Sequence, residues 1–298
     1  MKRAIFLCFG IFIYIYSSAC DVCGCGASNY GIGILPQFHK HFVGIRYQYS
    51  GFTSIPHENE KNASPTNESF QSIQAWGRWS AHKRIQIFAF MPYKINKRIA
   101  DKTNVVNGIG DISLLATYVP INTAHKEKPW KHMLQLAIGM KMPTAKYDKV
   151  VDGLMLHPNI QLGTGSYDVH ANMQYTARYR QAGSNIELNY WYNGTNAQHF
   201  HFGNKMASSA KFFIWKNWKN ISFLPQIGVA SELSMQDKQN KTIQTHTGGY
   251  SVLAAGGLDL YYKKAGLQLQ IRRSLAEQLG EGHITSKPQF LTNFIYLF

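Results

Sequence analysis

Apolar and polar side chains alternate along much of the chain, with a period of two residues. The stretch "YDVHANMQYTARYR" (167–180) sets Tyr, Val, Ala and Met against Asp, His, Asn, Gln, Thr and Arg, and "VGIRYQYS" (43–50) and "MLQLAIGMKM" (133–142) do the same. Successive side chains of a strand face opposite sides, so each stretch predicts a strand with one apolar and one polar face. These stretches exceed the usual strand of about 5–6 residues. They match a tilted membrane-crossing strand of about 9–11 residues.

The same pattern continues over the whole chain and predicts about twelve such strands. An even number is typical of bacterial outer-membrane barrels. The fold class we expect is therefore all-β, an antiparallel transmembrane β-barrel of about 12 strands. The predicted strands are 40–50, 70–81, 84–94, 109–119, 131–142, 167–180, 185–194, 205–215, 219–233, 249–262, 265–275 and 288–298.

The connections between these strands alternate between short and long. Outer-membrane barrels have short periplasmic turns and longer outer loops, whereas the loops of a soluble β-sandwich need not sort by length. The one exception is "PINTAHKEKPW" (120–130), a longer connection on the short side. The short turns are 82–84, 181–184, 216–219 and 263–265, and the long loops are 51–69, 95–108, 143–166, 195–204, 234–248 and 276–287.

Aromatic residues support a membrane location for these strands. Tyr and Trp gather at both membrane interfaces, and here they lie near predicted strand ends, for example at Trp79, Trp191 and Tyr262. The chain ends in "FLTNFIYLF", a strand that finishes on Phe298. This ending resembles the terminal signature of bacterial outer-membrane barrel proteins. We therefore expect the bacterial outer membrane as the location and its lipid as a partner.

The chain opens with the three-part layout of a secretory signal peptide. A basic start is followed by an apolar run and then by the small residues Ser17, Ser18 and Ala19. We expect residues 1–19 to be removed, 20–37 to form a Cys-rich periplasmic segment, and 38–298 to form the barrel.

Composition excludes several other classes of protein. Of the residues, 45% are hydrophobic and 13% aromatic, which excludes a disordered chain. The net charge of +15 comes from dispersed lysines and arginines, whereas nucleic-acid binding requires a concentrated basic stripe. The twelve histidines are scattered, and no Gly-x-Ser-x-Gly motif appears. We therefore expect neither an enzyme nor a nucleic-acid partner.

Three cysteines, Cys20, Cys23 and Cys25, lie directly after the predicted cleavage point, and no cysteine follows. Exported cysteines usually form disulfides, but three is an odd number. Cys20 could alternatively carry a lipid anchor. A third reading is a soft-metal site for Cu(I) or Zn, because thiolates favour these ions. His39 and His41 would then add imidazole ligands from the start of the first strand.

The polar faces of the predicted strands carry charged residues that would line the lumen of the barrel. Their excess of cations favours neutral or anionic solutes, although barrels also fill their lumens with paired charges for stability. The inward cations are Arg46, Arg78, Lys141, Arg178, Lys211 and Arg272, and the inward carboxylates are Asp111, Asp168, Glu187 and Glu232.

Two of these carboxylates, Asp111 and Asp168, follow glycine-rich bends where long loops rejoin the sheet. Glycine tolerates the backbone angles of such bends. The carboxylates could bind rim amides or an arginine across the lumen, or they could contact a ligand. The bends contain Gly108, Gly110, Gly163 and Gly165.

Residues 38–298 resemble the family of outer-membrane transporters named for the meta-pathway of phenol degradation. The resemblance implies a barrel and the passage of small molecules, and it implies no catalytic residues. Ala145 stands where the family usually has glycine. The matching segments are "MPYKI" (91–95), "NGIGDISLLATYVP" (107–120), "LQLAIGMKMPTAKYD" (134–148) and "LQLGTGSYDVHANMQY" (161–175).

Three functions remain open at this point. The first is an outer-membrane channel or transporter for a small-molecule solute. The second is a copper-handling protein, or one that docks a periplasmic protein partner, through the segment 20–37. The third is a structural membrane anchor whose lumen is filled by side chains.

The second function generates a direct test. If the thiolates hold copper, replacing Cys23 and Cys25 by Ser abolishes Cu(I) binding and leaves the barrel intact. Titration of the folded protein with Cu(I) measures this. An unchanged copper stoichiometry in the double variant would refute the copper reading.

Overall fold

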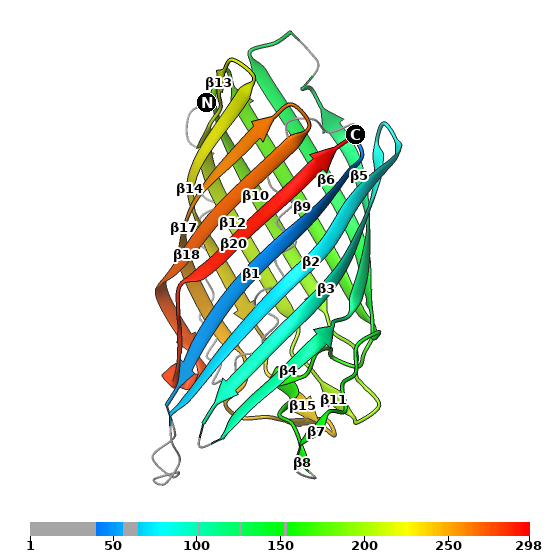
Figure 1. Ribbon diagram of the computed structural model, residues 1–298, viewed down its shortest axis with the longest axis vertical. Coiled ribbons are helices and arrows are strands. Elements are labelled where there is room, and N and C mark those ends of the chain that lie inside the picture. The colour runs from blue at the N-terminus through cyan, green and yellow to red at the C-terminus, as the bar shows by residue number, and fades with distance from the viewer. Residues whose placement is uncertain (1–39, 56–64, 101, 125–126, 152–153) are drawn as a thin grey trace, which may run out of the picture.

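The computed structural model describes residues 40–55, 65–100, 102–124, 127–151 and 154–298. One antiparallel sheet curls round and closes on itself, with strands tilted against the long axis (Figure 1). The barrel strands are β1 (Phe42–Ser54), β2 (Thr66–His82), β3 (Ile85–Ile99), β5 (Ile112–Asn122), β6 (Trp130–Met142), β9 (Asp168–Tyr179), β10 (Ala182–Tyr192), β12 (Lys205–Ile214), β14 (Ile221–Ser234), β17 (Gly249–Tyr262), β18 (Ala265–Leu279) and β20 (Gln289–Leu297).

Closure comes from the first and last strands. β1 pairs with β20 in a continuous antiparallel register, from Phe42 opposite Leu297 to Tyr49 opposite Phe290. The backbone N–H of Phe298 also donates to the carbonyl of His41 at 3.0 Å. Because the last strand pairs with the first, the barrel wall has no edge whose backbone groups would remain unpaired. The predicted twelve-stranded antiparallel barrel is confirmed.

The strands follow the predicted spans closely and differ from them at the outer ends. The sequence pattern predicted a loop over 95–108, but β3 continues to Ile99 and the chain returns as β4 (Thr103–Ile109), which pairs with β3. This hairpin supports part of the mouth described below. The remaining short elements are β7 (Val150–Val151), β8 (Leu154–Met155), β11 (Phe200–His201), β13 (Lys216–Trp218), β15 (Lys238–Gln239), β16 (Thr242–Ile243), β19 (Ile284–Ser286), and the 3-10 turns η2 (Pro158–Ile160) and η3 (Gly280–Gly282).

The two ends of the barrel differ in their connections, as the sequence predicted. The tight turns lie at the end where the chain terminates, drawn at the top of Figure 1, and the long loops lie at the opposite end. Arg180 and Lys263 in two tight turns adopt φ of 51°, a left-handed conformation typical of two-residue hairpin turns. By the rule for outer-membrane barrels, the end with tight turns is periplasmic.

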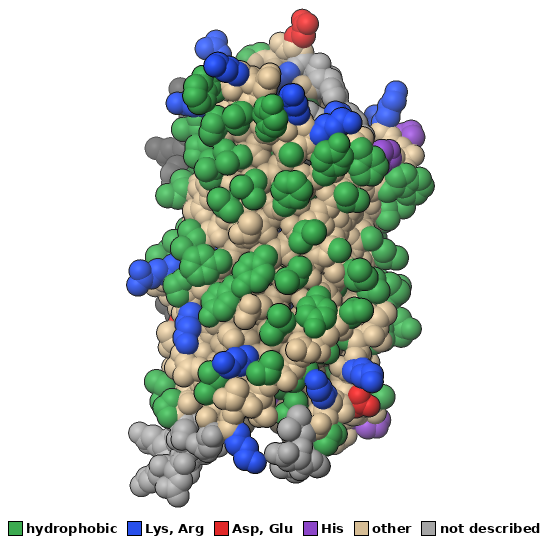
Figure 2. All heavy atoms as spheres, in the orientation of Figure 1, with side chains coloured by type: hydrophobic (Ala, Val, Ile, Leu, Met, Phe, Trp, Pro, Cys, Tyr) green, Lys and Arg blue, Asp and Glu red, His purple; other side chains and the backbone are tan. Residues whose placement is uncertain are grey.

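The outer surface of the barrel is apolar and its interior is polar. Ile138, Phe212 and Ile227 expose 64%, 67% and 71% of their surface, whereas Gln135, three positions before Ile138 on β6 and so on its opposite face, is only 1% exposed. Figure 2 shows hydrophobic side chains spread along the barrel, with Lys and Arg mostly toward its two ends. This reversed distribution is that of a barrel whose outside contacts lipid. Among the described residues, no helix is long and apolar enough to span a membrane.

Within the lumen, aromatic and aliphatic side chains pack into a cluster near the periplasmic end, which we call the apolar layer. The rings of Phe42 and Trp76 meet edge to face at 4.6 Å, and Phe88 and Phe90 stack. Phe88, Leu224 and Ile295 have no exposed surface, so side chains fill the lumen here. The members are Phe42, Trp76, Phe88, Phe90, Leu115, Ala137, Phe213, Leu224, Tyr261, Ile295 and Leu297.

The lipid-facing assignment predicts the effect of a charge on the outer wall. Ile138→Arg should lower the free energy of unfolding by roughly 2–4 kcal/mol, because a charge at the middle of the bilayer is poorly solvated. Urea titration in lipid vesicles measures this. Ile243→Arg in β16 is the matched control, since Ile243 is 52% exposed in an outer loop and should tolerate the change. Equal effects of the two substitutions would contradict a lipid-facing Ile138.

Candidate functional site

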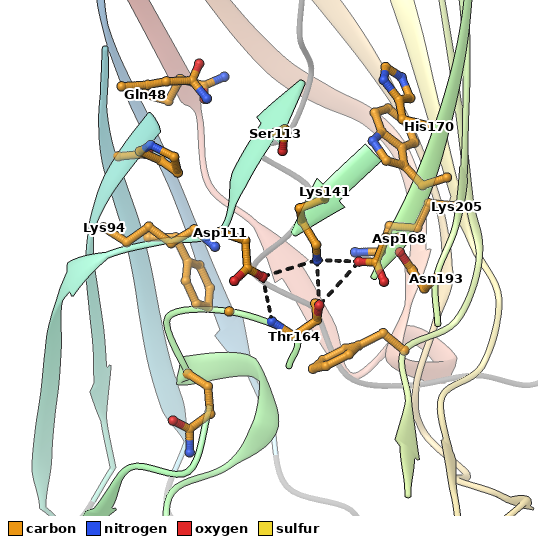
Figure 3. A pocket seen from close by; sticks show the side chains of 18 of the residues that line it. Gln48, Lys94, Asp111, Ser113, Lys141, Thr164, Asp168, His170, Asn193 and Lys205 are labelled. Atoms are coloured by element: carbon orange, nitrogen blue, oxygen red, sulfur yellow. Dashed lines mark hydrogen bonds and ion pairs between the residues drawn. The ribbon is translucent and has the colours of Figure 1, made fainter. Parts of the chain in front are cut away.

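A cavity of about 120 Å³ opens in the outer half of the lumen. It lies between the apolar layer and the long loop that connects β6 to β9, residues 143–167, which we call the mouth loop (Figure 3). Leu115 belongs to both the cavity wall and the apolar layer, and Trp191 lines the cavity while packing against that layer. The cavity therefore ends where the apolar layer begins.

Lys141, Asp111 and Asp168 form an ionic cluster in the wall of the cavity. The ammonium group of Lys141 forms an ion pair with Asp168 and lies 3.4 Å from Oδ2 of Asp111. It also donates to Oγ1 of Thr164 at 2.6 Å (Figure 3). Both carboxylates are buried, and buried charges are tolerated only when they are paired and hydrogen-bonded. Lys141 is therefore the counterion that allows two aspartates to lie side by side.

Asp111 binds the backbone of the mouth loop at two points. Its Oδ1 accepts from the N–H of Ala145 at 3.1 Å, and its Oδ2 accepts from the N–H of Thr164 at 3.0 Å. A Cβ at Gly163 would lie 2.5 Å from Oδ1 of Asp111, so only glycine allows this approach. The family-like motifs at 107–113, 142–148 and 161–168 thus converge on one carboxylate.

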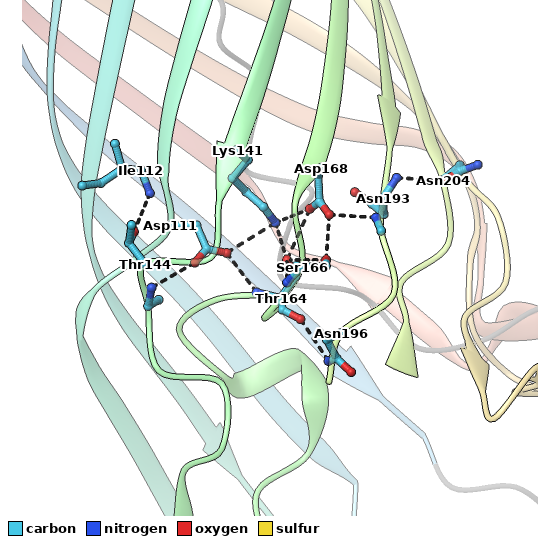
Figure 4. A network of polar contacts seen from close by, with 12 residues as sticks. Asp111, Ile112, Lys141, Thr144, Thr164, Ser166, Asp168, Asn193, Asn196 and Asn204 are labelled. Carbon is cyan, nitrogen blue, oxygen red and sulfur yellow. Dashed lines mark hydrogen bonds and ion pairs between the residues drawn. The ribbon is translucent and has the colours of Figure 1, made fainter. Parts of the chain in front are cut away.

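Asp168 fixes a second stretch of backbone. Its Oδ1 accepts from Oγ of Ser166 at 2.7 Å and from the N–H of Gly194 at 2.9 Å. The side-chain amide of Asn196 donates to the carbonyl of Thr164 at 3.0 Å (Figure 4). The mouth loop is thereby tied to the loop that follows β10.

The mouth loop also folds against the β3–β4 hairpin. The Nδ2 of Asn96 on β3 donates to the carbonyls of Ile160 and Gln161, at 3.0 and 3.1 Å. Ile160 and Leu162 pack with Val106 of β4 in a small buried cluster. The extended hairpin, which the sequence pattern did not predict, is therefore the surface that receives the mouth loop.

The charges around the cavity are mainly positive. Among the described residues that line it, Arg46, Lys94, Lys141 and Lys205 are cationic, whereas only Asp111 and Asp168 are acidic. Both of those carboxylates are engaged with Lys141. A wall with an excess of cationic groups in a low-dielectric surrounding attracts anions and repels cations.

Deeper in the lumen, polar side chains form hydrogen-bonded chains across the strands. The guanidinium of Arg46 lies 4.2 Å from the ring centroid of Trp76, whose Nε1 donates to Asn293 at 2.8 Å. Asn293 donates to Gln268, and Gln268 donates to Asp259 at 3.0 Å. Arg46 was predicted from sequence as a lumen residue, and it is 1% exposed.

The other predicted lumen residues lie at two heights along the barrel, in the middle of the lumen and at its periplasmic end. Glu187 accepts from Asn172 at 3.1 Å, and Arg272 lies 3.6 Å from Glu232. Lys211 lies within electrostatic range of both Glu187 and Arg272. These residues face the middle of the lumen, apart from the ionic cluster.

The last two predicted residues lie at the periplasmic end. Arg78 donates to the carbonyl of Lys40 at 2.6 Å and covers the ring of Phe42. Arg178 lies 4.5 Å from the ring centroid of Trp215. The structure thus brings Asp111, Lys141 and Asp168 together and leaves Arg78 and Arg178 far along the barrel from them.

The residues of the predicted metal site lie mostly outside the described part of the chain. Cys20, Cys23, Cys25 and His39 precede residue 40, so the thiol reading, Cu(I) or Zn included, stays a prediction. His41 is described: its Nδ1 accepts from the N–H of Ser80 at 3.2 Å, and its ring stacks on Phe298. Across the described ranges, no three His, Cys, Asp or Glu side chains lie close enough to hold a metal.

Several residues of the cavity escaped the sequence analysis. Lys94 and Lys205 lie at strand positions whose alternation marks them as inward, so the pattern contained the signal. Thr164 and Asn196 belong to loops, where alternation carries no information. Only the folded loops bring these two within reach of the ionic cluster.

The solved structures that match the fold include two of the same class. An outer membrane channel from Pseudomonas putida F1 matches with a TM-score of 0.64 at 12% identity, covering 89% of this chain and 100% of that one. The beta domain of the Bordetella autotransporter BrkA matches with a TM-score of 0.51 at 13% identity, covering 87% and 100%. No protein-family model and no curated protein matches the chain.

These observations define the class of the protein. The closed twelve-stranded sheet, the apolar outer wall and the two structural matches make it an outer-membrane β-barrel. The fold implied by the family resemblance is thus confirmed, while membership in that family stays a prediction.

The ionic cluster predicts what happens when its cation is removed. Lys141→Met leaves two buried carboxylates without a counterion, which costs about 3–5 kcal/mol for a buried pair. We expect a lower melting temperature and faster proteolytic cleavage within the mouth loop. Adding Asp111→Asn and Asp168→Asn should restore much of the loss, because the remaining groups are neutral. Lys263→Met in a periplasmic turn is the control. Unchanged cleavage of the mouth loop in Lys141→Met would contradict its pinning role.

Proposed function

We propose that the protein is a selective channel of the outer membrane for small neutral or anionic solutes. The observation that carries this proposal is the cation-lined cavity in the outer half of the lumen, held open by the pinned mouth loop. A solute arriving from outside meets this cavity first. Arg46, Lys94 and Lys205 attract anions and discourage cations there.

The apolar layer is the natural gate of such a channel. Its side chains come from strands on several sides of the barrel and are almost fully buried. Hydrophobic constrictions in channels block water and ions until side chains move apart. Exchange of aromatic rotamers would therefore control passage from the cavity to the periplasm.

The apolar layer also supports a second candidate, a structural anchor with a filled lumen. In that case the buried rings serve only the stability of the barrel, and the cavity is a surface pocket at its outer mouth. The two candidates differ in one observable property, which is the movement of solutes through the purified barrel.

The channel proposal predicts anion preference in planar lipid bilayers. Under a salt gradient, the reversal potential should have the sign expected when chloride crosses more readily than potassium. Lys94→Glu combined with Lys205→Glu should shift the preference toward potassium, because two cations of the cavity become anions.

Lys263→Glu combined with Lys264→Glu, in a periplasmic turn, is the matched control and should change the reversal potential less. A cation preference in the natural protein would contradict the proposed selectivity. Neither ionic current nor uptake of any small solute would favour the structural anchor.

A further inference from the structure

One wall of the lumen stays polar along its length, on β9 and β10. We call this wall the polar ribbon. At the level of the apolar layer, the described residues of these two strands contribute no core member, and only Trp191 of β10 packs against it. The ribbon consists of Asp168, His170, Asn172, Gln174, Thr176 and Arg178 on β9, of Asn185, Glu187 and Asn189 on β10, and of Asn193 just after β10.

The middle of the ribbon is held by its own hydrogen bonds. Glu187 Oε1 accepts from the amides of Asn172 and Asn189, both at 3.1 Å. Asn189 Oδ1 accepts from Asn172 at 2.8 Å and lies 3.0 Å from Nε2 of His170. The ring of His170 stacks on Trp191 at 4.7 Å. These contacts fix the side chains, so the ribbon presents a fixed set of polar atoms to the lumen.

Beside this network lies a patch of buried amide atoms without a partner. Gln174 is 1% exposed, and its Oε1 has no hydrogen-bond partner within the described chain; neither has Oδ1 of Asn172. Gln135 of β6, directly opposite Gln174 in the register, is 1% exposed and has partners for neither amide atom. We call Gln135, Asn172 and Gln174 the amide patch. Leaving such groups buried without partners costs roughly 1–3 kcal/mol each.

The chemistry of the amide patch selects among solutes. It offers mostly acceptor oxygens together with one amide donor, and no charge of its own. A hydroxyl group both donates and accepts, so it satisfies such atoms in either direction. An anion would face acceptor oxygens, and a cation would first have to cross the cation-lined cavity. The solute that fits both regions is neutral and rich in hydroxyl groups.

We propose that small neutral polyhydroxylated solutes cross the lumen along the polar ribbon, exchanging hydrogen bonds with the amide patch as they pass the apolar layer. This inference rests on the proposed channel function and narrows its solute class. The apolar layer then serves as the opposite wall, which contacts the C–H faces of the solute and slows ions relative to neutral solutes.

Swelling of vesicles that contain the full-length protein tests this inference. The probes are erythritol, a neutral tetrol, and glycine betaine, which is about the same size and has no hydrogen-bond donor. We expect erythritol to enter faster. Gln135→Leu combined with Gln174→Leu should slow erythritol entry by about fivefold for each lost hydrogen bond and leave betaine entry unchanged.

The same variant carries a second readout. Since both amide atoms of Gln135 and Oε1 of Gln174 have no partner within the described chain, their loss in Gln135→Leu and Gln174→Leu should not lower the melting temperature of the barrel. Gln268→Leu on β18 is the matched control, because its amide donates to Asp259 and Tyr261. That variant should lower the melting temperature and leave the erythritol-to-betaine ratio unchanged.

Three results would overturn the inference. These are betaine entry at least as fast as erythritol entry in the natural protein, an unchanged erythritol rate in the double variant, or an equal loss for both solutes. The first needs no variant at all. Each of these leaves the channel function standing, because solutes still cross. A natural protein that passes neither solute nor ions would instead remove the channel function itself.

Discussion

The requirement that every backbone N–H and C=O find a partner inside a bilayer governs this structure. No water is available at the middle of the membrane, so a sheet there must close on itself. The register between β1 and β20 meets that requirement. Closure in turn fixes which face of each strand meets lipid, because side chains alternate across the wall. The polar face of each strand therefore lines the lumen, which is why charged side chains lie there.

Enclosing so many polar groups in one lumen creates an energetic problem that the protein solves in three ways along its length. At the outer mouth, Lys141 pairs with two aspartates, and the three side chains tie down a loop. In the middle, amides and carboxylates bond one another, as where Asn172 and Asn189 both donate to Glu187. Toward the periplasm, aromatic rings replace polar groups on most strands. Within the described chain, β9 and β10, like β18, contribute no member to the apolar layer, and the polar ribbon gives the lumen one wall unlike the ring-lined one.

The barrel could be predicted from sequence because its signal is local. Alternation in 167–180 or 249–262 reports the two faces of a strand directly, and the alternation of short and long connections reports the two ends. The β3–β4 hairpin and the mouth loop could not be predicted in this way. Their positions depend on contacts between distant segments, such as Asn96 with Ile160 and Asp111 with Ala145. Inward charges were recognisable, but which of them meet was not, because the tilt of the strands sets their relative heights.

The mouth loop is attached to Asp111 near its two ends, at Ala145 and Thr164. The carboxylate of Asp111 accepts hydrogen bonds from the backbone amides of Ala145 and Thr164, and Gly163 has no side chain that would block this approach. Ile160, Gln161 and Leu162, just before the second of these bonds, also contact the β3–β4 hairpin. A lineage or an engineer can therefore exchange the segment between Ala145 and Ile160 as a cassette, altering what the entrance admits while the barrel and these attachments stay the same.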